Sequence, residues 1–558
     1  VGGTSAAAPM WAAAIVLANQ YQLAHHGTNL GFLNPTLYTL LNTNALYRQA
    51  FHDVVQGSNL YYPAGTGYDM VTGIGTPDVY GFALAVASLP GPAPVPSSTR
   101  WYFAEGRVGG GFQEYLTLEN PNASSPAQVT INYLLRGRPS LSQSVSVAAS
   151  TRMTLDVNVF LHVSRFAGGQ DVSVALTSNV PIVAERPIYF NFAGNTPGGS
   201  DIVGTAQPGQ HFTFANGETL PGYNTFLTIL NPPGQSTATV TATYYSQGSR
   251  IGQSVANVPS GQRGTIAVNW ALPSGKQFLI QVDSSQPVVI ERPLYFHIAV
   301  PGIPGIVNGG SSVLGSAPAT SWYFPDGYTG AQGVPSQENL ILANPNANGA
   351  GTSASVTVTY ALANGTTKTV NIAVPANSQV VESVNADVGG GTLVSMKVQV
   401  TNGIGIVAER QEFFSFPSLA PASTGVEVVG VAPGSQGLAS IYSFAEGHLG
   451  STFSEYVTLF NPNNSPVRVS VTYFVRQGTA HFISQQQVNV AAMGLAQVNG
   501  NAFLHIPATG GGSADTSLVV QSLPDSNNTV LPIAVERSLY FNYGGAMPGS
   551  TSVMGFSG

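Results

Sequence analysis

A serine near the start of the chain stands in a setting that suits nucleophilic chemistry. Residues 2–9 read GGTSAAAP, so Ser5 follows two glycines and a threonine and opens an alanine-rich stretch. Glycines permit a tight turn and the close approach of a substrate, and a helix N-terminus offers free N–H groups and partial positive charge to a developing oxyanion. The motif predicts either a nucleophile at Ser5 or, more simply, a serine that caps a helix.

Two aspartates further along the chain stand in a pattern that suits a hard cation. Asp53 lies in FHDVVQGSN (51–59) and Asp69 in AGTGYDMVTGIGTP (64–77), with a glycine-rich turn that can direct backbone carbonyls inward. Ca²⁺ takes six or more oxygen ligands at about 2.3–2.6 Å, many of them carbonyls. This segment therefore predicts a Ca²⁺ site.

Together, the two motifs resemble the end of the catalytic domain of the sedolisin (serine-carboxyl peptidase) family, over residues 1 to about 88. Subtilisins share the Gly-Thr-Ser motif but have no such aspartate element after their serine. The resemblance implies a subtilisin-like α/β fold, a protein or peptide substrate, activity at acidic pH, and Ser5 as the catalytic nucleophile. The implied Ca²⁺ ligands are the carboxylates of Asp53 and Asp69 and the backbone carbonyls of Val54, Gly65 and Gly67.

The sequence departs from that family in its acids. The family's catalytic Glu, the Asp that supports it and the Asp of the oxyanion hole all precede the serine, whereas this sequence begins four residues before Ser5. The acidic residues between 1 and 88 are Asp53, Asp69 and Asp78. The histidines available for a Ser-His arrangement are His25, His26 and His52. His25 and His26 are adjacent and follow a predicted helix, which favours a role as its polar C-terminal cap.

A nucleophile without its base retains little activity, so we expect this chain alone to be inactive. We favour an incomplete sequence as the explanation. An N-terminal part on a separate, associated polypeptide and a relic domain are the alternatives.

Composition excludes several classes of function. The 558 residues carry a net charge of −7 and only 18 scattered basic residues, which excludes a nucleic-acid-binding surface. The lack of cysteine excludes disulfides and thiol chemistry. No apolar run reaches the roughly 18 residues that a membrane span needs. Charged residues make up only 8%, against about 25% in an average protein, which indicates a neutral exterior. The lack of cysteine fits an exported protein, and we expect an extracellular or cell-surface location.

The pattern changes near residue 89. Before it, residues 8–24, 35–41 and 79–89 are predicted to be helical, with a proline in the first turn of the first helix. Residues 90–98 (PGPAPVPSS) contain four prolines and predict an extended linker. After it, short alternating apolar runs separated by Gly, Pro and Asn predict strands and turns.

The strand-rich part repeats four times. Each copy opens with an aromatic–glycine segment (WYFAEG, FTFANG, WYFPDG, YSFAEG), and its next strand ends in Asn-Pro. A late strand contains Glu-Arg (IVAERPIYF, VVIERPLYF, IVAERQEFF, IAVERSLYF), and a short strand ending in glycine closes the copy. The Asn-Pro asparagines, separated by 111, 113 and 117 residues, are Asn120, Asn231, Asn344 and Asn461. This period exceeds the roughly 20–50 residues of solenoid repeats and fits a β-sandwich domain.

The predicted fold is therefore multidomain, with the C-terminal portion of a subtilisin-like α/β domain followed by four tandem all-β immunoglobulin-like sandwiches. The predicted boundaries are 1–88 for the peptidase segment, 89–99 for the linker, and 100–207, 208–318, 319–434 and 435–558 for the sandwiches. Because the joining segments are short and rich in Ala, Pro and Gly, we expect the sandwiches to form an extended rod.

The recurring Glu-Arg pair is the candidate polar site of the repeats. Neighbours on a strand point to opposite faces, so one member can face the core and pair with the acid of the opening motif in the same copy. The residues of these predicted structural salt bridges are Glu105, Arg186, Arg292, Asp326, Arg410, Glu446 and Arg537, with Asn216 in place of the acid in the second copy. Ligand binding by these residues is the alternative.

Several functions remain open for the repeats. The first hypothesis is that they are a spacer or binding appendage that holds a secreted acid endopeptidase to a surface or polymer. The second is that they self-associate into a surface layer or filament in which the peptidase segment is a remnant. Carbohydrate binding is a third hypothesis. The aromatic residues that either fill the cores or stack on sugars are Trp101, Tyr102, Trp322 and Tyr323. Potential acceptors for N-linked glycans are Asn122, Asn364, Asn463 and Asn527.

Overall fold

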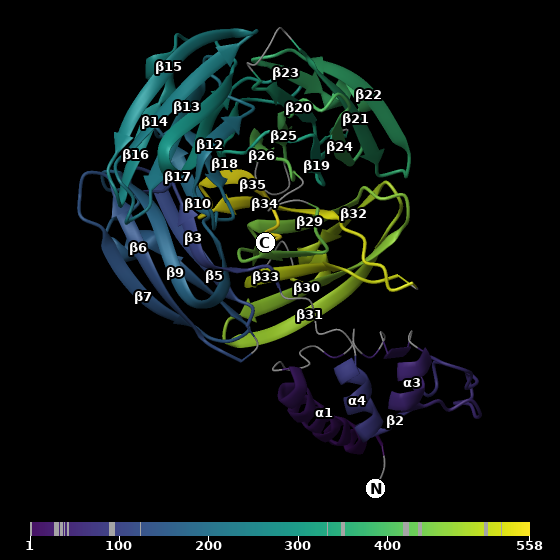
Figure 1. The fold of residues 1–558 in the computed structure, drawn as a ribbon. Coiled ribbons are helices and arrows are strands. Elements are labelled where there is room, and N and C mark those ends of the chain that lie inside the picture. The colour runs from purple at the N-terminus through teal and green to yellow at the C-terminus, as the bar shows by residue number, and fades with distance from the viewer. Residues whose placement is uncertain are drawn as a thin grey trace. The chain divides into compact units, whose positions relative to one another are not determined.

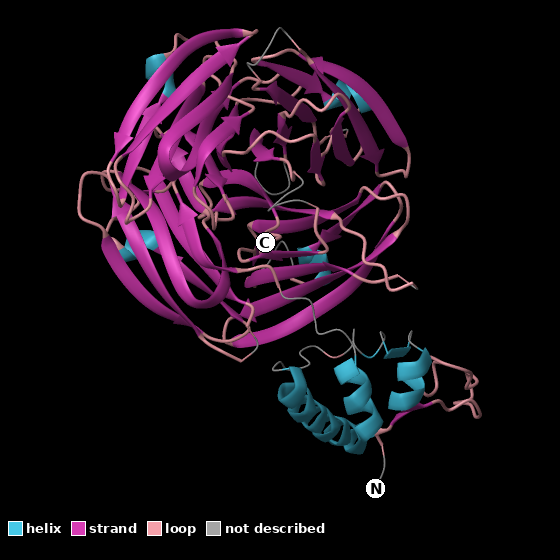
Figure 2. Ribbon diagram, viewed as in Figure 1, coloured by secondary structure: helices cyan, strands magenta, loops and turns pink. Residues whose placement is uncertain are grey.

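The structure, a computed structural model, describes residues 3–26, 33, 37, 40–41, 44–88, 95–122, 124–331, 333–346, 352–416, 423–432, 438–506, 512–525 and 527–558. The chain forms two compact units, residues 1–94 with 122–125 and residues 95–121 with 126–558. Helices prevail in the first unit and strands in the second (Figure 2). No described helix is long and apolar enough to cross a membrane.

The first unit is built on the helices α1 (Thr4–His26), α3 (Asn44–Ala50) and α4 (Val79–Ser88). Strands β1 (Phe51–His52) and β2 (Thr76–Pro77) pair antiparallel at the base of the aspartate loop. Trp11 holds α1 in place, because its ring lies 6.3 Å from the rings of both Phe51 and Phe82. The helices predicted at 8–24 and 79–89 are confirmed, while most of 35–41 and of the linker at 89–99 lies outside the described residues.

The second unit consists of four copies of one strand pattern, called copies 1 to 4 in chain order. Copy 1 contains β3 (Ser98–Phe103), β4 (Arg107–Val108), β5 (Phe112–Asn120), β6 (Ala127–Leu135), β7 (Leu141–Val147), β8 (Thr151–Asp156), α5 (Val157–Phe160), β9 (Gln170–Glu185), β10 (Ile188–Phe192) and β11 (Thr196–Ser200). Copy 2 contains β12 (Gly209–Phe214), β13 (Tyr223–Asn231), β14 (Ala238–Ser246), β15 (Ser249–Val258), β16 (Gln262–Ala267), α6 (Val268–Ala271), β17 (Leu279–Ile298) and β18 (Val307–Leu314).

Copies 3 and 4 repeat the pattern. Copy 3 contains β19 (Ser321–Phe324), β20 (Ser336–Asn344), β21 (Ala354–Leu362), β22 (Thr367–Val374), β23 (Ser378–Ser383), α7 (Val384–Val388), β24 (Val394–Val400), β25 (Val407–Ser415) and β26 (Ser423–Val429). Copy 4 contains β27 (Ile441–Phe444), β28 (His448–Leu449), β29 (Phe453–Asn461), β30 (Val467–Gln477), β31 (Ala480–Val490), β32 (Gly494–Asn499), α8 (Gly500–Phe503), β33 (Ala514–Ser522), β34 (Ala534–Tyr543) and β35 (Met547–Met554).

Each copy is a sandwich of two sheets with one strand order. In copy 4 the sheets are β27-β33-β30-β31 and β32-β29-β34-β35, and in copy 3 the corresponding strands are β19-β24-β21-β22 and β23-β20-β25-β26. In copies 1 and 2 one long strand, β9 or β17, takes part in both sheets. The sandwich prediction is confirmed. The strand order differs from the ABED/CFG order of immunoglobulin domains, because strand periodicity does not specify which strands pair.

Two asparagines per copy, the first of them buried in every copy, join the parts of the sandwich. The asparagine of each Asn-Pro pair donates its Nδ2–H to a backbone carbonyl at the end of the other sheet: Asn120 to Val147, Asn231 to Val258, Asn344 to Val374 and Asn461 to Val490, at 2.8–3.2 Å. A second asparagine, in the one-turn helix, accepts the backbone N–H that opens the long strand: Asn158 from Glu114, Asn269 from Thr225, Asn385 from Glu338 and Asn501 from Glu455.

The four copies close into a ring (Figure 1). Their last strands, β11, β18, β26 and β35, contact one another in cyclic order. The strands approach closely at Gly198, Gly309, Gly425 and Gly549, where a Cβ atom built on either Gly198 or Gly549 would lie 3.0 Å from a glycine Cα of the next strand. The expectation of an extended rod is therefore wrong, because the short joining segments fold the copies onto one another.

Candidate functional site

Ser5 lies exposed in the first turn of α1. The preceding Gly3 has a φ of +104°, a left-handed conformation that suits glycine, and its carbonyl accepts helical bonds from the N–H groups of Ala6 (3.0 Å) and Ala7 (3.2 Å). The hydroxyl thus stands at a helix start, where nearby backbone N–H groups can stabilise an oxyanion.

The other polar residues around this segment have separate positions. His52 lies exposed on β1 opposite Thr76, and the side chains of His25 and His26 are outside the described residues. The Asp78 carboxylate accepts the Gly81 N–H at 2.8 Å and caps α4.

The aspartate loop folds around its two carboxylates. Asp69 accepts N–H bonds from Gly65 (3.0 Å), Val71 (2.8 Å) and Thr72 (2.7 Å), and Asp53 accepts one from Gly67 (2.7 Å). These bonds, first that from Gly65, lower the pKa of Asp69 to about 2, so it is ionised at any ordinary acidic pH.

The oxygens of this loop fit a cation site in part. The Asp53 Oδ1 atom is buried and has no hydrogen-bond partner among the described residues. The Thr72 hydroxyl lies 3.0 Å from Asp69 Oδ2 and 3.5 Å from the Val54 carbonyl, which brings that carbonyl near the second carboxylate. Burial and the negative charge of both aspartates raise the pKa of Tyr47. An unpartnered carboxylate oxygen beside a second carboxylate and a carbonyl is a donor set that Ca²⁺ accepts.

The recurring Glu-Arg residues form ion pairs between copies. We call the four interfaces seam 1–2, seam 2–3, seam 3–4 and seam 4–1. Each arginine pairs with the glutamate of the next copy, and copy 4 pairs with copy 1: Arg186 with Glu291 (3.0 Å), Arg292 with Glu409 (2.7 Å), Arg410 with Glu536 and Arg537 with Glu185 (2.8 Å). All eight side chains are buried.

Each of these glutamates also accepts a backbone N–H from the opening motif of the preceding copy. The donors are Ala104, Ala215, Asp326 and Ala445, at 2.6–3.1 Å. The predicted salt bridges within a copy are therefore wrong in their partners, because strand alternation indicates the face of a side chain but not the copy that covers it.

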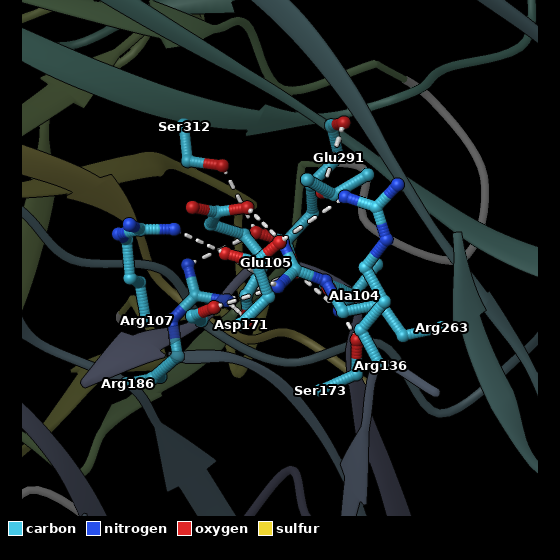
Figure 3. A network of polar contacts seen from close by, with 12 residues as sticks. Ala104, Glu105, Arg107, Arg136, Asp171, Ser173, Arg186, Arg263, Glu291 and Ser312 are labelled. Carbon is cyan, nitrogen blue, oxygen red and sulfur yellow. Dashed lines mark hydrogen bonds and ion pairs between the residues drawn. The ribbon is translucent and has the colours of Figure 1, made fainter. Parts of the chain in front are cut away.

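The acids of the opening motif also reach across the seams. At seam 1–2, Glu105 pairs with Arg263 at 3.0 Å, and Figure 3 shows this pair beside Arg186 and Glu291. At seam 4–1, Glu446 pairs with Arg152 at 2.6 Å. Their contacts to the arginine of their own copy are through backbone carbonyls, which Arg186 and Arg537 bind.

The other two opening motifs have no such arginine among the described residues. At seam 3–4, Asp326 accepts bonds from Thr458 (2.9 Å) and Ser538 (2.6 Å) of copy 4. In copy 2, Asn216 donates to Glu218 at 3.2 Å.

A further set of buried acids was not predicted. Glu114, Glu338 and Glu455 occupy the same position early in the long strand of copies 1, 3 and 4, and each is fully buried. Burial raises the pKa of Glu114 to about 8 and of Glu455 to about 7, and it raises the pKa of Glu338 well above its usual range. The sequence signal that could have revealed these acids is a glutamate at the same place in three copies, in QEYL, QENL and SEYV.

The tryptophans of the opening motif belong to the cores. Trp101 and Trp322 are at most 1% exposed, and their Nε1–H groups donate to the carbonyls of Ile182 (3.0 Å) and Ile406 (2.9 Å). They leave no open ring face for a sugar, which favours the core-filling alternative.

No family model matches the chain, but its N-terminal segment is similar to curated peptidases. Tripeptidyl-peptidase sed1 of Aspergillus fumigatus is 40% identical over 95 residues, and kumamolisin of Bacillus sp. strain MN-32 is 41% identical over 96; each match covers 16% of this chain. Tripeptidyl-peptidase 1 of Rattus norvegicus is 34% identical over 84 residues, 14% of this chain. The chain spans only 14–15% of the length of these relatives. The predicted family resemblance of this segment is confirmed.

Among solved structures, the likeness is local. Thermotoga maritima 1070 matches 20% of this chain over 94% of its own length, with 17% identity and a TM-score of 0.18. The Anabaena sensory rhodopsin transducer matches 17% of this chain over 99% of its own length, with 21% identity and a TM-score of 0.15. Likeness at this level supports no statement about the function of the repeats.

Proposed function

We propose that this chain is the C-terminal portion of a secreted sedolisin-type acid endopeptidase, in which a ring of four sandwiches follows the end of the catalytic domain and serves as an attachment or spacing appendage. The observation that carries the peptidase part is the aspartate loop, whose carboxylates stand in the sequence pattern of the family and are held by the N–H groups of Gly65 and Gly67. The similarity to the tripeptidyl-peptidases and kumamolisin over the same segment supports it.

In this proposal Ser5 attacks the scissile carbonyl of a protein or peptide substrate. The exposed hydroxyl at the start of α1 is accessible to a substrate, and the helix start favours negative charge on the carbonyl oxygen. The proton of the hydroxyl must pass to a carboxylate, and the acids described between residues 3 and 88 are engaged in the aspartate loop or in capping α4. The base is therefore expected from outside residues 1–88.

The test of this role compares Ser5→Ala with the parent. The product of the complete reading frame that contains these residues should cleave a denatured protein at about pH 4, and Ser5→Ala should reduce kcat at least about 10⁴-fold, because nucleophile and base act as a unit. The 558-residue chain alone should be inactive. An inactive complete product, or a Ser5→Ala variant with parental activity, would refute the proposal.

We propose that the aspartate loop holds Ca²⁺ through the Asp53 and Asp69 carboxylates and the Val54, Gly65 and Gly67 carbonyls. When bound, the ion cross-links the loop and neutralises two adjacent negative charges. Chelation with EGTA should lower the melting temperature of the first unit, and calcium should restore it.

Two variants separate a metal site from general loss of stability. Asp69→Ala should abolish the response to calcium. Asp78→Ala should lower stability by about 1 kcal/mol through loss of the α4 cap and leave the response intact. An Asp69→Ala protein that still responds to calcium as the parent does would contradict the site.

The closed ring supports the appendage over the filament. A head-to-tail interface builds filaments only when rotation does not return to the start, and here copy 4 pairs with copy 1 through Arg537 and Glu185. The surfaces of copies 1 and 4 that could otherwise join one chain to the next in a filament thereby bind each other within one chain.

A structural surface-layer or filament protein is the second candidate, and carbohydrate binding is a weaker one. The exposed glycan-acceptor positions Asn364 and Asn527 are compatible with either. Electron microscopy of the concentrated protein should show single particles of uniform size, and ordered polymers would favour the second candidate.

A further inference from the structure

Among the described residues, the acid of the opening motif has an arginine partner from the next copy at only two of the four seams. Arg152 and Arg263, which pair with Glu446 and Glu105, occupy the same position in their copies. Arg152 lies on β8 opposite Glu119, and Arg263 lies on β16 opposite Leu230. In both copies, the residue opposite the arginine directly precedes the asparagine of the Asn-Pro pair.

The same position is occupied differently in the other two copies. It is Gln379, opposite Ala343, in copy 3, and Leu495, opposite Phe460, in copy 4. At seam 2–3 the two equivalent positions are the neutral Asn216 and Gln379, so neither of these two residues carries a charge. At seam 3–4 the carboxylate of Asp326 is retained, while the equivalent of its arginine is the uncharged Leu495.

Seam 3–4 therefore concentrates buried carboxyl groups around one guanidinium. Arg410 contacts Glu536, Glu412 (3.1 Å) and Glu338 (3.9 Å). Neither side-chain oxygen of Glu338 has a hydrogen-bond partner among the described residues. The titratable or charged groups that interact here are Asp326, Tyr328, Glu338, Tyr360, Arg410, Glu412, Glu536 and Tyr540.

The other seams have a better supply of cations. At seam 1–2, the guanidiniums of Arg186 and Arg263 are shared by three buried glutamates: Glu105, Glu114 and Glu291. At seam 4–1, the guanidiniums of Arg152 and Arg537 are shared by five buried acids: Glu119, Glu185, Asp201, Glu446 and Glu455. At seam 2–3, the guanidinium of Arg292 alone is shared by three buried glutamates: Glu218, Glu409 and Glu427. Among the described residues, seam 3–4 has four buried acids and a single arginine, the lowest supply of cations per acid of the four seams.

We propose that seam 3–4 is a proton-dependent clasp, which stays closed while its surplus carboxyl groups are protonated and is the first seam to open as the pH rises. An isolated buried carboxylate without a partner is strongly unfavourable, so each surplus group must either keep a proton or gain access to water. Opening of the seam provides that access.

The direction of the pH dependence follows from the same groups. Burial raises the pKa of Glu412 and of Glu536 to about 7 against the opposing effect of Arg410, and it raises the pKa of Glu338 well above its usual range. A carboxyl whose pKa is higher in the folded protein contributes stability that is complete below about pH 4.5 and is lost as the pH rises through about 7. The ring is thus most firmly closed in acid, a property independent of peptidase activity.

Hydrogen–deuterium exchange of the full chain at pH 5 and pH 8, corrected for intrinsic exchange rates, tests the clasp. Peptides from β19 and β32, which lie at seam 3–4, should lose protection at least about tenfold more than peptides from β3 and β16, which lie at seam 1–2. Equal loss at both seams, or earlier opening of seam 1–2, would overturn the proposal.

Two variants and a control address the cause. Leu495→Arg supplies the missing cation and Glu338→Gln removes one buried charge, so each should reduce the difference between pH 5 and pH 8. Asp525→Asn, which neutralises an exposed carboxylate that among the described residues accepts only backbone N–H bonds, from Asn527 and Thr529, should leave it unchanged. If Leu495→Arg does not fold, Glu338→Gln alone tests the proposal. A Glu338→Gln variant with the same pH dependence as the parent would refute the role of these carboxyl groups.

Discussion

At the scale of single residues, buried charge ties each copy to the next. Arg537 illustrates this, since its guanidinium binds Glu185 and Asp201 of copy 1 and the backbone carbonyl of Glu446 in its own copy. A buried pair contributes little net stability compared with apolar residues of the same shape, but the loss of one partner leaves an uncompensated charge. We therefore expect the buried ion pairs at the seams to act chiefly against incorrect pairing of copies.

Arg537→Leu should destabilise the second unit by about 3–5 kcal/mol, because Glu185 and Asp201 would remain buried without their cation. Urea denaturation followed by circular dichroism measures this change. The matched control is Arg468→Leu in the same copy, where the exposed guanidinium makes one long bond of 3.4 Å to a carbonyl, and its effect should stay within about 0.5 kcal/mol. Similar losses in both variants would contradict the role of the seam.

Residue types were predicted from the sequence better than their partners. The recurrence of Glu-Arg in a chain with few charges indicated that each charge has a fixed partner, and the structure provides one for every arginine of the set. The partner's copy was missed because alternation along a strand specifies a face only. Arg152 and Arg263 were missed because this cation does not recur in copies 3 and 4.

At the scale of elements, the last strand of each copy forms the centre of the ring. These strands approach so closely that a side chain at the central glycine would meet the backbone or an aromatic ring. At Gly309 an added Cβ would lie 2.7 Å from the Phe296 ring and 3.2 Å from the Gly425 carbonyl oxygen. The glycine is needed here for space, since its φ is not in the left-handed region.

Gly309→Ala should cost about 1–3 kcal/mol through overpacking at the ring centre. Thermal denaturation of the full chain measures the loss. Gly168→Ala is the control, because a Cβ there would meet no atom within 4 Å, and it should be neutral or slightly stabilising. A neutral Gly309→Ala variant would mean that the strands can separate without loss of stability.

The elements themselves were partly predictable. The Asn-Pro landmark was found from its spacing, and its role became clear only when the side chain was seen to join the two sheets. The one-turn helices with Asn158 and its equivalents were missed, since a single turn of VNVF or GNAF has no helical periodicity to detect. Strand pairing order depends on long-range contacts that no local pattern contains.

At the scale of the whole second unit, the cores continue across the seams. The core of copy 1 includes Ala445, Val553 and Phe556 of copy 4, and the core of copy 3 includes Ala215 and Leu279 of copy 2. Shared apolar packing of this kind couples the stability of neighbouring copies, as does the cyclic contact of the last strands.

The second unit should therefore unfold in one cooperative transition and not in four. Leu116→Ala, in the core of copy 1, should destabilise the entire unit by about 2–5 kcal/mol and preserve a single transition. Differential scanning calorimetry compares the calorimetric and van't Hoff enthalpies for this unit. Separate transitions, with only one of them shifted by the variant, would show that the copies unfold independently.

Covalent linkage of the four copies has a consequence for how such a ring can diverge. In a ring of identical subunits, one substitution changes all four interfaces at once. Here each seam is encoded by its own residues, and equivalent positions already hold Glu105 with Arg263, Asn216 with Gln379, and Asp326 with Leu495. In a gene of this design, a substitution can weaken one interface while the other three keep their residues, so the four interfaces can differ in strength within one heritable unit.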